Sequence, residues 1–364
     1  MRLLTVNTGS TSSKLDLFDV DDQHSECISS HHDSSGEDSP EQVLRTIAPD
    51  PAEVDAVVHR VVHGGSHFVK SCLIDQQAEQ QIEHLSRLAP LHNPVALQWI
   101  QASRQYLGKP QVAVFDTAYF ANLPTVASAY AIPGQIARDQ QIRRYGFHGI
   151  AHQAMWQRWC ELRPDLPEGG NLITLQLGGG CSATANRSGA PLDTSMGFSP
   201  AEGLVMATRS GDIDPGIIFQ WIREQHMSVD DIEKLINEES GLLGLSGKSD
   251  SMGDIIDDPD PQCRLAVEAY CYRVRKYIGA YQAVLGGVDG IVFGGGVGEH
   301  IPPVRSHILT HMAWCGIQLD QSRNENTIGK EAKISADNST IDVRVIPVDE
   351  AAILINEART VLRA

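Results

Sequence analysis

The most informative part of the chain is DTSMGFSPAEGLVMATRSGDIDPG, residues 193–216. This segment is too polar and too rich in glycine and proline for a regular core element, and turn-forming residues dominate it. It carries a single arginine, Arg209, in a setting of Gly, Ser and Thr. A long irregular segment inside a compact domain usually carries a site, although an ordered surface loop would have the same composition.

Length and charge narrow the class of protein. A chain of 364 residues suggests about two domains, and an apolar fraction of 41% is enough for ordinary cores. The net charge of −17 argues against nucleic acid or an anionic membrane surface as a partner. It does not argue against an anionic substrate, because a few arginines can make a local positive pocket in an acidic protein.

The cysteines and the N-terminus indicate a compartment. The seven cysteines are odd in number and never form a CxxC pair, which predicts free thiols in a reducing environment. The first residues, MRLLTVNTGSTSS, lack the apolar run of a signal peptide, and no other run approaches the length of a membrane span. We therefore expect a cytoplasmic protein.

A strand, a polar turn and a second strand occur twice in the sequence. Residues 3–6 and 14–20 read as strands on either side of NTGSTSSK, residues 7–14. About 170 residues later, 171–175 and 181–186 flank the turn QLGGG at 176–180. Flexible backbone with hydroxyls, an ammonium or glycines suits a phosphate, although a polar hairpin tip has the same composition. The repetition suggests two similar α/β domains with one phosphate loop each.

Hydrophobic periodicity predicts the other elements. Residues 76–88 read as an exposed helix, and Met155, Trp156 and Trp159 are expected in the core. Further strands are predicted at 54–62, 112–115 and 291–293, and helices at 76–88, 95–107, 150–162, 216–226, 229–237, 263–285 and 350–362.

Two short motifs suggest other nucleotide folds, but neither is complete. A dinucleotide-binding GxGxxG frame that starts at Gly294 would need glycine at 299, where the chain has Glu299. A Walker A loop that ends at Gly247-Lys248-Ser249 would need glycine at 242, where the chain has Leu242. The sequence also contains no HExxH motif and no Cys/His pattern with zinc spacing.

Eight further motifs occur in the order typical of one enzyme family. Together with residues 193–216, they make the chain resemble the acetate kinase family, the short-chain carboxylate kinases, over nearly its whole length. Residues 21–50 and 320–345 match least. The other motifs are NTGSTSSK at 7–14, HRVVHGG at 59–65, APLHNP at 89–94, FDTA at 115–118, RRYGFHG at 143–149, GLLGLSGKS at 241–249, GGGVGE at 294–299 and DEAAIL at 349–354.

The resemblance implies a fold and a reaction. The fold would be α/β, with two actin-like domains that face a cleft: residues 1–120 plus 351–364, and residues 121–350. The reaction would be reversible transfer of the γ-phosphoryl group of ATP to acetate or a near homologue, with ADP as the other product. The resemblance also implies direct in-line transfer without a phosphoenzyme, Mg²⁺ or Mn²⁺ as the metal, and a homodimer.

Phosphoryl transfer to a carboxylate brings two anions together, so catalysis is mostly positioning and charge neutralisation. By resemblance, Arg60 and Arg209 bind the carboxylate and the transferring phosphoryl group, His148 stabilises the transition state, and Asp116 orients an arginine or polarises the site. By the same resemblance, the acyl slot would be formed by Val62, Leu91, Phe147 and Pro200, and His92 would also line the substrate site with Arg60. Asn7 and Glu350 would hold the metal, largely through water. The nucleotide would be bound by Ser10, Ser12, Lys14, Gln176, Gly178, Gly179, Gly180, Ser251, Met252, Gly253, Gly294, Gly295, Gly296, Val297 and Gly298.

The chain departs from the family pattern mainly where the nucleotide would bind. The usual HLGNG loop reads QLGGG here, so Gly179 replaces an asparagine. Ser251 and Gly253 stand where an acid and an arginine usually contact the nucleoside. The acyl-transfer residues are kept, which predicts weakened nucleoside recognition. Propionate, butyrate or pyrophosphate as a substrate, or a catalytically silent nucleotide-binding regulatory protein, remain as alternatives. The acyl chain length, the phosphate donor and the physiological direction stay open.

Overall fold

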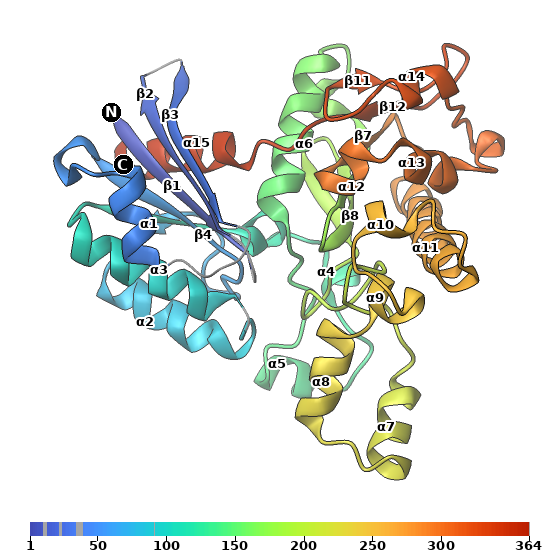
Figure 1. Ribbon diagram of the computed structural model, residues 1–364, viewed down its shortest axis with the longest axis horizontal. Coiled ribbons are helices and arrows are strands. Elements are labelled where there is room, and N and C mark those ends of the chain that lie inside the picture. The colour runs from blue at the N-terminus through green and yellow to red at the C-terminus, as the bar shows by residue number, and fades with distance from the viewer. Residues whose placement is uncertain (10–12, 22–23, 34–38, 91, 364) are drawn as a thin grey trace. The chain divides into compact units, whose positions relative to one another are not determined.

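The computed structural model describes residues 1–9, 13–21, 24–33, 39–90 and 92–363. Within these residues the chain forms two compact units, each with its own mixed β-sheet (Figure 1). The first unit contains residues 1–121, 147–154 and 349–364, and the second contains residues 122–146 and 155–348. The predicted division placed residues 147–154 in the second domain, whereas their contacts place them in the first unit.

The sheet of the first unit has the strand order β3-β2-β1-β4-β6-β5. Strand β1 pairs antiparallel with β2 and parallel with β4, which in turn pairs parallel with β6. The carboxyl ends of these three parallel strands therefore lie along one edge of the sheet. The strands are β1 (Arg2–Thr8), β2 (Ser13–Val20), β3 (Ser25–Asp33), β4 (Ala56–Val61), β5 (Cys72–Leu73) and β6 (Gln111–Phe115).

Helices cover this first sheet and close its core. Helices α1 (Pro40–Ile47), α2 (Gln76–His84) and α3 (Asn93–Tyr106) contribute the apolar side chains that pack on β1, β2, β4 and β6. The last helix, α15 (Glu350–Arg363), returns from the far end of the chain and packs on β1, β4 and β6. Its Leu354 and Ala358 are fully buried, which is consistent with the amphipathic pattern predicted for this helix.

The sheet of the second unit repeats the same arrangement, in the order β9-β8-β7-β10-β12-β11. Strand β7 pairs antiparallel with β8 and parallel with β10, as β1 does with β2 and β4. The predicted internal duplication and the α/β fold class with two mixed-sheet domains are therefore confirmed. The strands are β7 (Asn171–Leu177), β8 (Cys181–Arg187), β9 (Ala190–Thr194), β10 (Gly290–Gly294), β11 (Ala332–Lys333) and β12 (Asp342–Val345).

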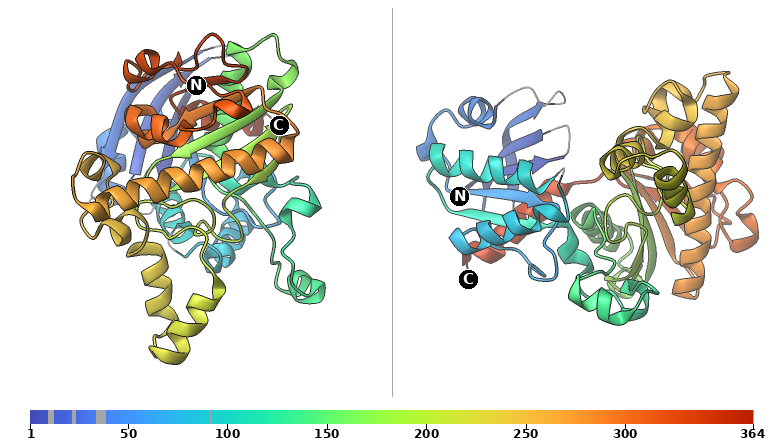
Figure 2. Two further views of the ribbon diagram at one scale, coloured as in Figure 1. Left: turned by 90° about the vertical axis from the view of Figure 1, so that its right-hand side faces the viewer. Right: turned by 90° about the horizontal axis from the view of Figure 1, so that it is seen from below.

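The long helix α11 (Pro261–Leu285) crosses one face of this second sheet (Figure 2). It begins after Asp260, whose carboxylate accepts the backbone N–H of Gln262, and it ends at Gly286 in the left-handed conformation. Helix α6 (Gly149–Leu162) starts in the first unit and ends in the second. The other helices are α4 (Thr125–Ser128), α5 (Gly134–Asp139), α7 (Pro215–Glu224), α8 (Val229–Glu238), α9 (Gly241–Ser246), α10 (Met252–Ile255), α12 (Gly295–His300), α13 (Pro302–Leu309) and α14 (Gln321–Glu325).

All the strands and helices predicted from periodicity are present, with small shifts at their ends. Met155 and Trp159 of α6 are fully buried in a cluster with Leu172 and Val292, and Trp156 packs against the same cluster. The prediction that these side chains belong to the core is thus confirmed. All seven cysteines are unpaired. In the described part of the chain, no helix is long and apolar enough to cross a membrane.

Candidate active site

Four polar side chains meet at the carboxyl edge of the first sheet. Asn7 and Arg60 are the next-to-last residues of β1 and β4, Asp116 directly follows β6, and Glu350 begins α15. Ligands of α/β proteins usually bind beyond the carboxyl ends of parallel strands. Arg60 lies within the strand predicted at 54–62, and its backbone pairs with Val114 of β6, which fixes where the side chain begins.

Arg60 is at the centre of this group. Its Nε and one Nη donate to Oδ2 of Asp116 at 3.0 and 2.7 Å, and its other Nη donates to Oδ1 of Asn7 at 3.0 Å. The Asn7 amide nitrogen in turn donates to Glu350 at 2.6 Å. The single positive charge of Arg60 thus faces two carboxylates: Asp116, which is fully buried, and Glu350, whose nearest oxygen is 3.9 Å away. The two acidic neighbours raise the pKa of Arg60, although its burial acts in the opposite sense.

The FHG motif brings His148 to the same edge. His148 has a φ of +57°, which is uncommon for a residue with a side chain and is often found at functional sites. The next residue, Gly149, approaches the Asp116 carbonyl so closely that a Cβ atom would lie 1.9 Å from that oxygen. The backbone N–H of Ile150 donates to Oδ1 of Asp116 at 3.4 Å. The start of α6 therefore depends on glycine and on Asp116.

The predicted acyl-pocket residues are divided between the two units. Val62 and Phe147 are buried in the first unit, where the Phe147 ring meets His63 edge-on at 5.5 Å between ring centroids. His92 is half-buried at the start of α3, and Pro200 belongs to the second unit. Leu91 lies outside the described residues, as do Ser10 and Ser12 of the first phosphate turn. Lys14 is directly opposite Asn7 on β2, and its ammonium pairs with Asp16 at 3.3 Å.

Arg209 lies in the second unit, in the irregular segment between β9 and α7. Its guanidinium is half-buried and donates to the Pro200 carbonyl at 3.3 Å, with the Met206 sulfur at 3.9 Å. Among the described residues it has no carboxylate partner, in contrast to Arg60. Burial lowers its pKa, yet an arginine stays protonated at neutral pH. The Arg209 guanidinium is therefore a cation available to an anionic ligand.

The segment around Arg209 is firmly anchored. Arg144 donates to the Glu202 carboxylate at 2.6 Å and to the Thr194 carbonyl at 3.1 Å. Asp212 accepts the N–H of Gly203 at 2.8 Å, and Met196, Leu204 and Met206 are fully buried. Arg144 belongs to the RRYGFHG motif at 143–149, but nothing in the sequence indicates that Glu202, 58 residues away, is its partner.

The glycine-rich turn at 178–180 lies beside this segment. The Gly179 carbonyl accepts the N–H of Ala207 at 3.0 Å, two residues before Arg209. Gly179 is exposed, and a side chain there would meet nothing within 4 Å. Nearby, Oε1 of Gln176 is buried and has no hydrogen-bond donor in the described structure. The turn is thus open toward solvent and adjacent to an unpaired arginine, which is an arrangement suited to a phosphate chain.

The second glycine-rich segment, Gly294–Gly298, is next to the first because Gln176 pairs with Gly294 across β7 and β10. Gly295 (φ +76°) packs on the Leu177 backbone, whereas Gly296 has open space around it. Val297 is half-buried on α12. Ser251 and Gly253 are exposed near the start of α10, but the Met252 side chain is buried and contributes to packing.

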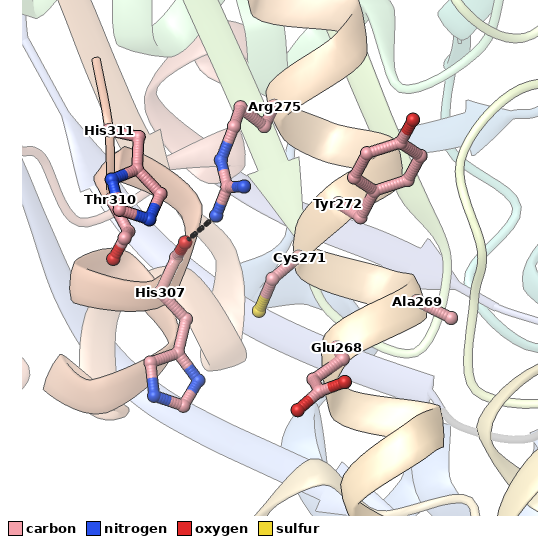
Figure 3. Close-up of a pocket in the computed structure, with 8 residues that line it drawn as sticks. All are labelled: Glu268, Ala269, Cys271, Tyr272, Arg275, His307, Thr310 and His311. Carbon is pink, nitrogen blue, oxygen red and sulfur yellow. Dashed lines mark hydrogen bonds between the residues drawn. The ribbon is translucent and has the colours of Figure 1, made fainter.

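A pocket of about 540 Å³ lies elsewhere, between α11 and the region of α13 (Figure 3). Arg275 spans it and donates to the His307 carbonyl. None of the predicted site residues lines this pocket. The lining residues are Glu268, Ala269, Cys271, Tyr272, Arg275, His307, Thr310 and His311.

The two predicted metal ligands can be tested against the chemistry of Mg²⁺. No group of three or more His, Cys, Asp or Glu side chains suited to a metal occurs in the described part of the chain. The Asn7 amide nitrogen donates to the Glu350 carboxylate, and its oxygen, which accepts from Arg60, keeps a second lone pair for a metal or its water. Mg²⁺ usually keeps several waters and binds one or two carboxylates plus phosphate oxygens, so this pair fits a mostly hydrated Mg²⁺ ion.

Comparison with known proteins gives a consistent result. The sequence profile of the Acetokinase family matches residues 40–356. An acetate kinase of Chloroherpeton thalassium is 44% identical over 85% of this chain and 76% of its own length. An acetate kinase of Thermotoga maritima is 39% identical over 100% of this chain and 99% of its own.

Solved structures agree with these relatives. The acetate kinase of Porphyromonas gingivalis has a TM-score of 0.88 and 35% identity, and the match covers 99% of both chains. A propionate kinase of Francisella tularensis has a TM-score of 0.89 and 32% identity, with 98% of both chains covered.

Proposed function

Because this chain belongs to the Acetokinase family, we propose that it transfers the γ-phosphoryl group of ATP reversibly to acetate or a near homologue. The products are an acyl phosphate and ADP. The observation that carries the proposal is the meeting of Asn7, Arg60, Asp116 and Glu350 at one sheet edge, although 343 residues separate the first from the last. A protein that only binds nucleotide has no need of this set.

The proposed roles follow from charge. Arg209, which has no carboxylate partner among the described residues, binds the incoming anions and the charge that develops on the transferring phosphoryl group. Arg60, whose plane is fixed by Asp116 and Asn7, contributes a directed N–H edge. His148 donates a hydrogen bond to the same group in the transition state. The attacking nucleophile is the substrate carboxylate, so no side chain forms a covalent intermediate.

Mg²⁺ or Mn²⁺ would be held by Asn7 and Glu350 and would neutralise the donor phosphates. When bound, the metal would supply positive charge to the donor phosphates, which the cluster itself lacks because its one cation, Arg60, already faces two carboxylates. The glycine turn at 178–180 and the exposed Gly296 would bind the donor phosphates.

The acceptor and the donor are best determined together. The experiment is a hydroxamate assay of acyl phosphate with acetate, propionate and butyrate, each with ATP, GTP, ITP and pyrophosphate. Acyl phosphate from acetate or propionate with a nucleoside triphosphate supports the proposal. Activity with pyrophosphate alone would show that pyrophosphate, and not ATP, is the phosphate donor. Absence of acyl phosphate with every pair of acceptor and donor would refute the enzymatic function.

We further propose that the protein is a homodimer, with α7 in the interface. Helix α7 is rich in apolar residues, yet none of its ten residues is buried, and Phe219 is 54% exposed. Together with α8 it projects from the rest of its unit (Figure 1). A second copy of the chain would cover this surface.

The unpaired cysteines also support the expectation of a cytoplasmic protein.

Sedimentation velocity at micromolar concentration tests the dimer. We expect the wild type to sediment as a dimer and Phe219→Asp as a monomer. Tyr272→Asp, which changes an exposed aromatic residue on α11, is the matched control and should stay dimeric. A monomeric wild type would refute the dimer and leave the chemistry untouched.

A further inference from the structure

Glu299 makes an unusual pair of contacts in the second unit. One oxygen of its carboxylate, Oε1, accepts two backbone N–H groups, from Gly295 at 2.8 Å and from Val348 at 3.1 Å. The first contact lies at the start of α12 and the second lies just beyond β12. One side chain therefore joins two segments that are 53 residues apart in the sequence.

The backbone of Glu299 also accepts a hydrogen bond from the Arg305 side chain. This arginine is fully buried and donates to the carbonyls of Gly298 at 2.7 Å and of Glu299 at 3.2 Å. Its other nitrogens are taken up by Asn324 and the Thr327 carbonyl. Burial lowers the pKa of Arg305 to about 10, and among the described residues it has no carboxylate partner. The buried Arg305 guanidinium thus supplies fixed hydrogen-bond donors to the carbonyl groups near the end of α12.

The contact with Gly295 changes the interpretation of the glycine-rich segment. The Gly295 N–H was expected to face a phosphate, but it already donates to a carboxylate. A Cβ atom on Gly294 would lie 2.6 Å from the Met155 sulfur, and one on Gly295 would lie 2.6 Å from the Leu177 carbonyl oxygen. These two glycines therefore serve close packing, and Gly296, which is exposed and has open space, is the member of the turn that remains accessible.

The contact with Val348 lies at a unit boundary. Val348 is the last residue of the second unit, and the chain enters the first unit at Asp349. The next residue, Glu350, is a proposed metal ligand. In the peptide that leads to Glu350, the Val348 N–H is thus the last hydrogen-bonded group described on the side of the second unit.

We propose that Glu299 is a positioning residue that anchors both the glycine-rich turn and the peptide leading to Glu350. Its kinetic consequence rests on the proposed function: loss of the carboxylate releases the donor-binding turn and the metal-binding segment together. The placement itself does not depend on the reaction, and it can be measured without substrate.

Hydrogen exchange followed by mass spectrometry measures this placement directly. Glu299→Ala removes the acceptor, and Glu299→Gln keeps an acceptor oxygen of nearly the same shape. Asp289→Ala is the matched control, because Asp289 accepts the Asn171 N–H at 2.8 Å at the opposite end of β10. We expect Glu299→Ala to accelerate exchange at Gly295 and Val348 by about tenfold or more, as for loss of a charge-assisted hydrogen bond. Glu299→Gln should retain much of the protection, and Asp289→Ala should affect only the region of Asn171.

Kinetics of the same variants test the consequence. We expect Glu299→Ala to raise both the donor KM and the half-saturating Mg²⁺ concentration by about tenfold, with a smaller change in the acetate KM. Faster exchange at only one of the two amides, or spread evenly over the second unit, would overturn the proposed anchor. An inactive wild type would refute the proposed function instead, and the exchange result would still decide the role of Glu299.

Discussion

Arg60 and Asp116 form an ion pair in which two guanidinium nitrogens donate to the same carboxylate oxygen, at 3.0 and 2.7 Å. Asp116 is fully buried, and the Arg60 side chain is only 13% exposed. Burial raises the pKa of Asp116, and the charge of Arg60 opposes that rise. The pair therefore holds Arg60 in one orientation. The attraction between the two charges must offset the free-energy cost of removing both from water.

The first prediction concerns this pair. Asp116→Ala should lower the free energy of unfolding by about 3–5 kcal/mol, because it leaves a nearly buried arginine without its partner. Adding Arg60→Met should recover most of that loss, since no buried charge then remains, but it should not restore activity. Urea unfolding and the hydroxamate assay of the two variants provide the measurement. Equal stability of Asp116→Ala and the wild type would contradict the argument.

The second prediction concerns Arg209. Arg209→Ala should lower kcat by about two to four powers of ten, as for loss of a donor that acts on developing charge. The melting temperature should barely change, because the side chain's described contacts are one carbonyl and one thioether. Arg158→Ala, which removes a surface arginine paired with Glu331, is the control and should keep full activity. Wild-type turnover in Arg209→Ala would refute the assignment.

Much of this architecture could be predicted from the sequence. The repeated strand-turn-strand pattern indicated two similar sheets, and β1 and β7 do occupy equivalent positions. What the sequence could not provide were contacts between distant residues. The motif around Arg209 was interpreted as a polar segment, but buried Met196 and Leu204 anchor it to the core. Composition describes a segment as an average, whereas burial depends on which few side chains point inward.

The same limit applied to individual charges. A local pattern cannot tell an arginine paired with a buried carboxylate from one without a partner, so Arg60 and Arg209 looked alike in the sequence. The structure distinguishes them through Asp116, which is 56 residues from Arg60. In the sequence, Glu299 is notable only because it stands where a GxGxxG motif from Gly294 would need glycine. Its two backbone contacts require β10, α12 and the segment after β12 to be assembled.

The third prediction concerns the acyl pocket. If Val62 borders the substrate, Val62→Ala should shift preference from acetate toward propionate by about 10- to 200-fold, the value of one methylene in an apolar site. Val61→Ala is a matched control, because Val61 belongs to the apolar cluster under α2 and α3. It should lower stability without changing the ratio of kcat/KM values for the two acids. An unchanged ratio in Val62→Ala would exclude this pocket.

The fourth prediction concerns pH and three buried histidines of the first unit. Burial lowers the pKa of His59 and of His63 from 6.5 to about 4, and that of His152 to about 3. The unfolded chain therefore binds more protons than the folded one below pH 6.5, so stability should fall as the pH drops from 6.5 toward 4. The expected slope is about 1.4 kcal/mol per pH unit for each histidine, with no change from these groups above pH 6.5.

Urea unfolding between pH 4.5 and pH 7.5 measures that slope. His59→Gln keeps an amide donor toward Gln111, which His59 contacts at 2.7 Å, but it cannot titrate. The variant should lose about a third of the pH dependence that the three histidines contribute. A slope identical to that of the wild type would show that His59 does not titrate in the unfolded state as assumed.

The last prediction concerns the phosphate donor. Gly253 and Gly179 occupy positions where related kinases usually have an arginine and an asparagine, and both are exposed with room for a side chain. We therefore expect the wild type to use ATP with a high KM and to discriminate poorly among ATP, GTP and ITP.

Gly253→Arg should lower the KM for ATP by about tenfold, because it adds a planar donor worth about one hydrogen bond to a charged group. Gly179→Asn should lower the KM for all three nucleotides alike, because its amide would meet phosphate and not the base. Gly247→Ala, at a left-handed glycine of the same loop region, controls for backbone effects and should not lower any KM. Tight, adenine-selective use of ATP by the wild type would show that other residues already supply the nucleoside contacts, and Gly253→Arg would then bring no gain.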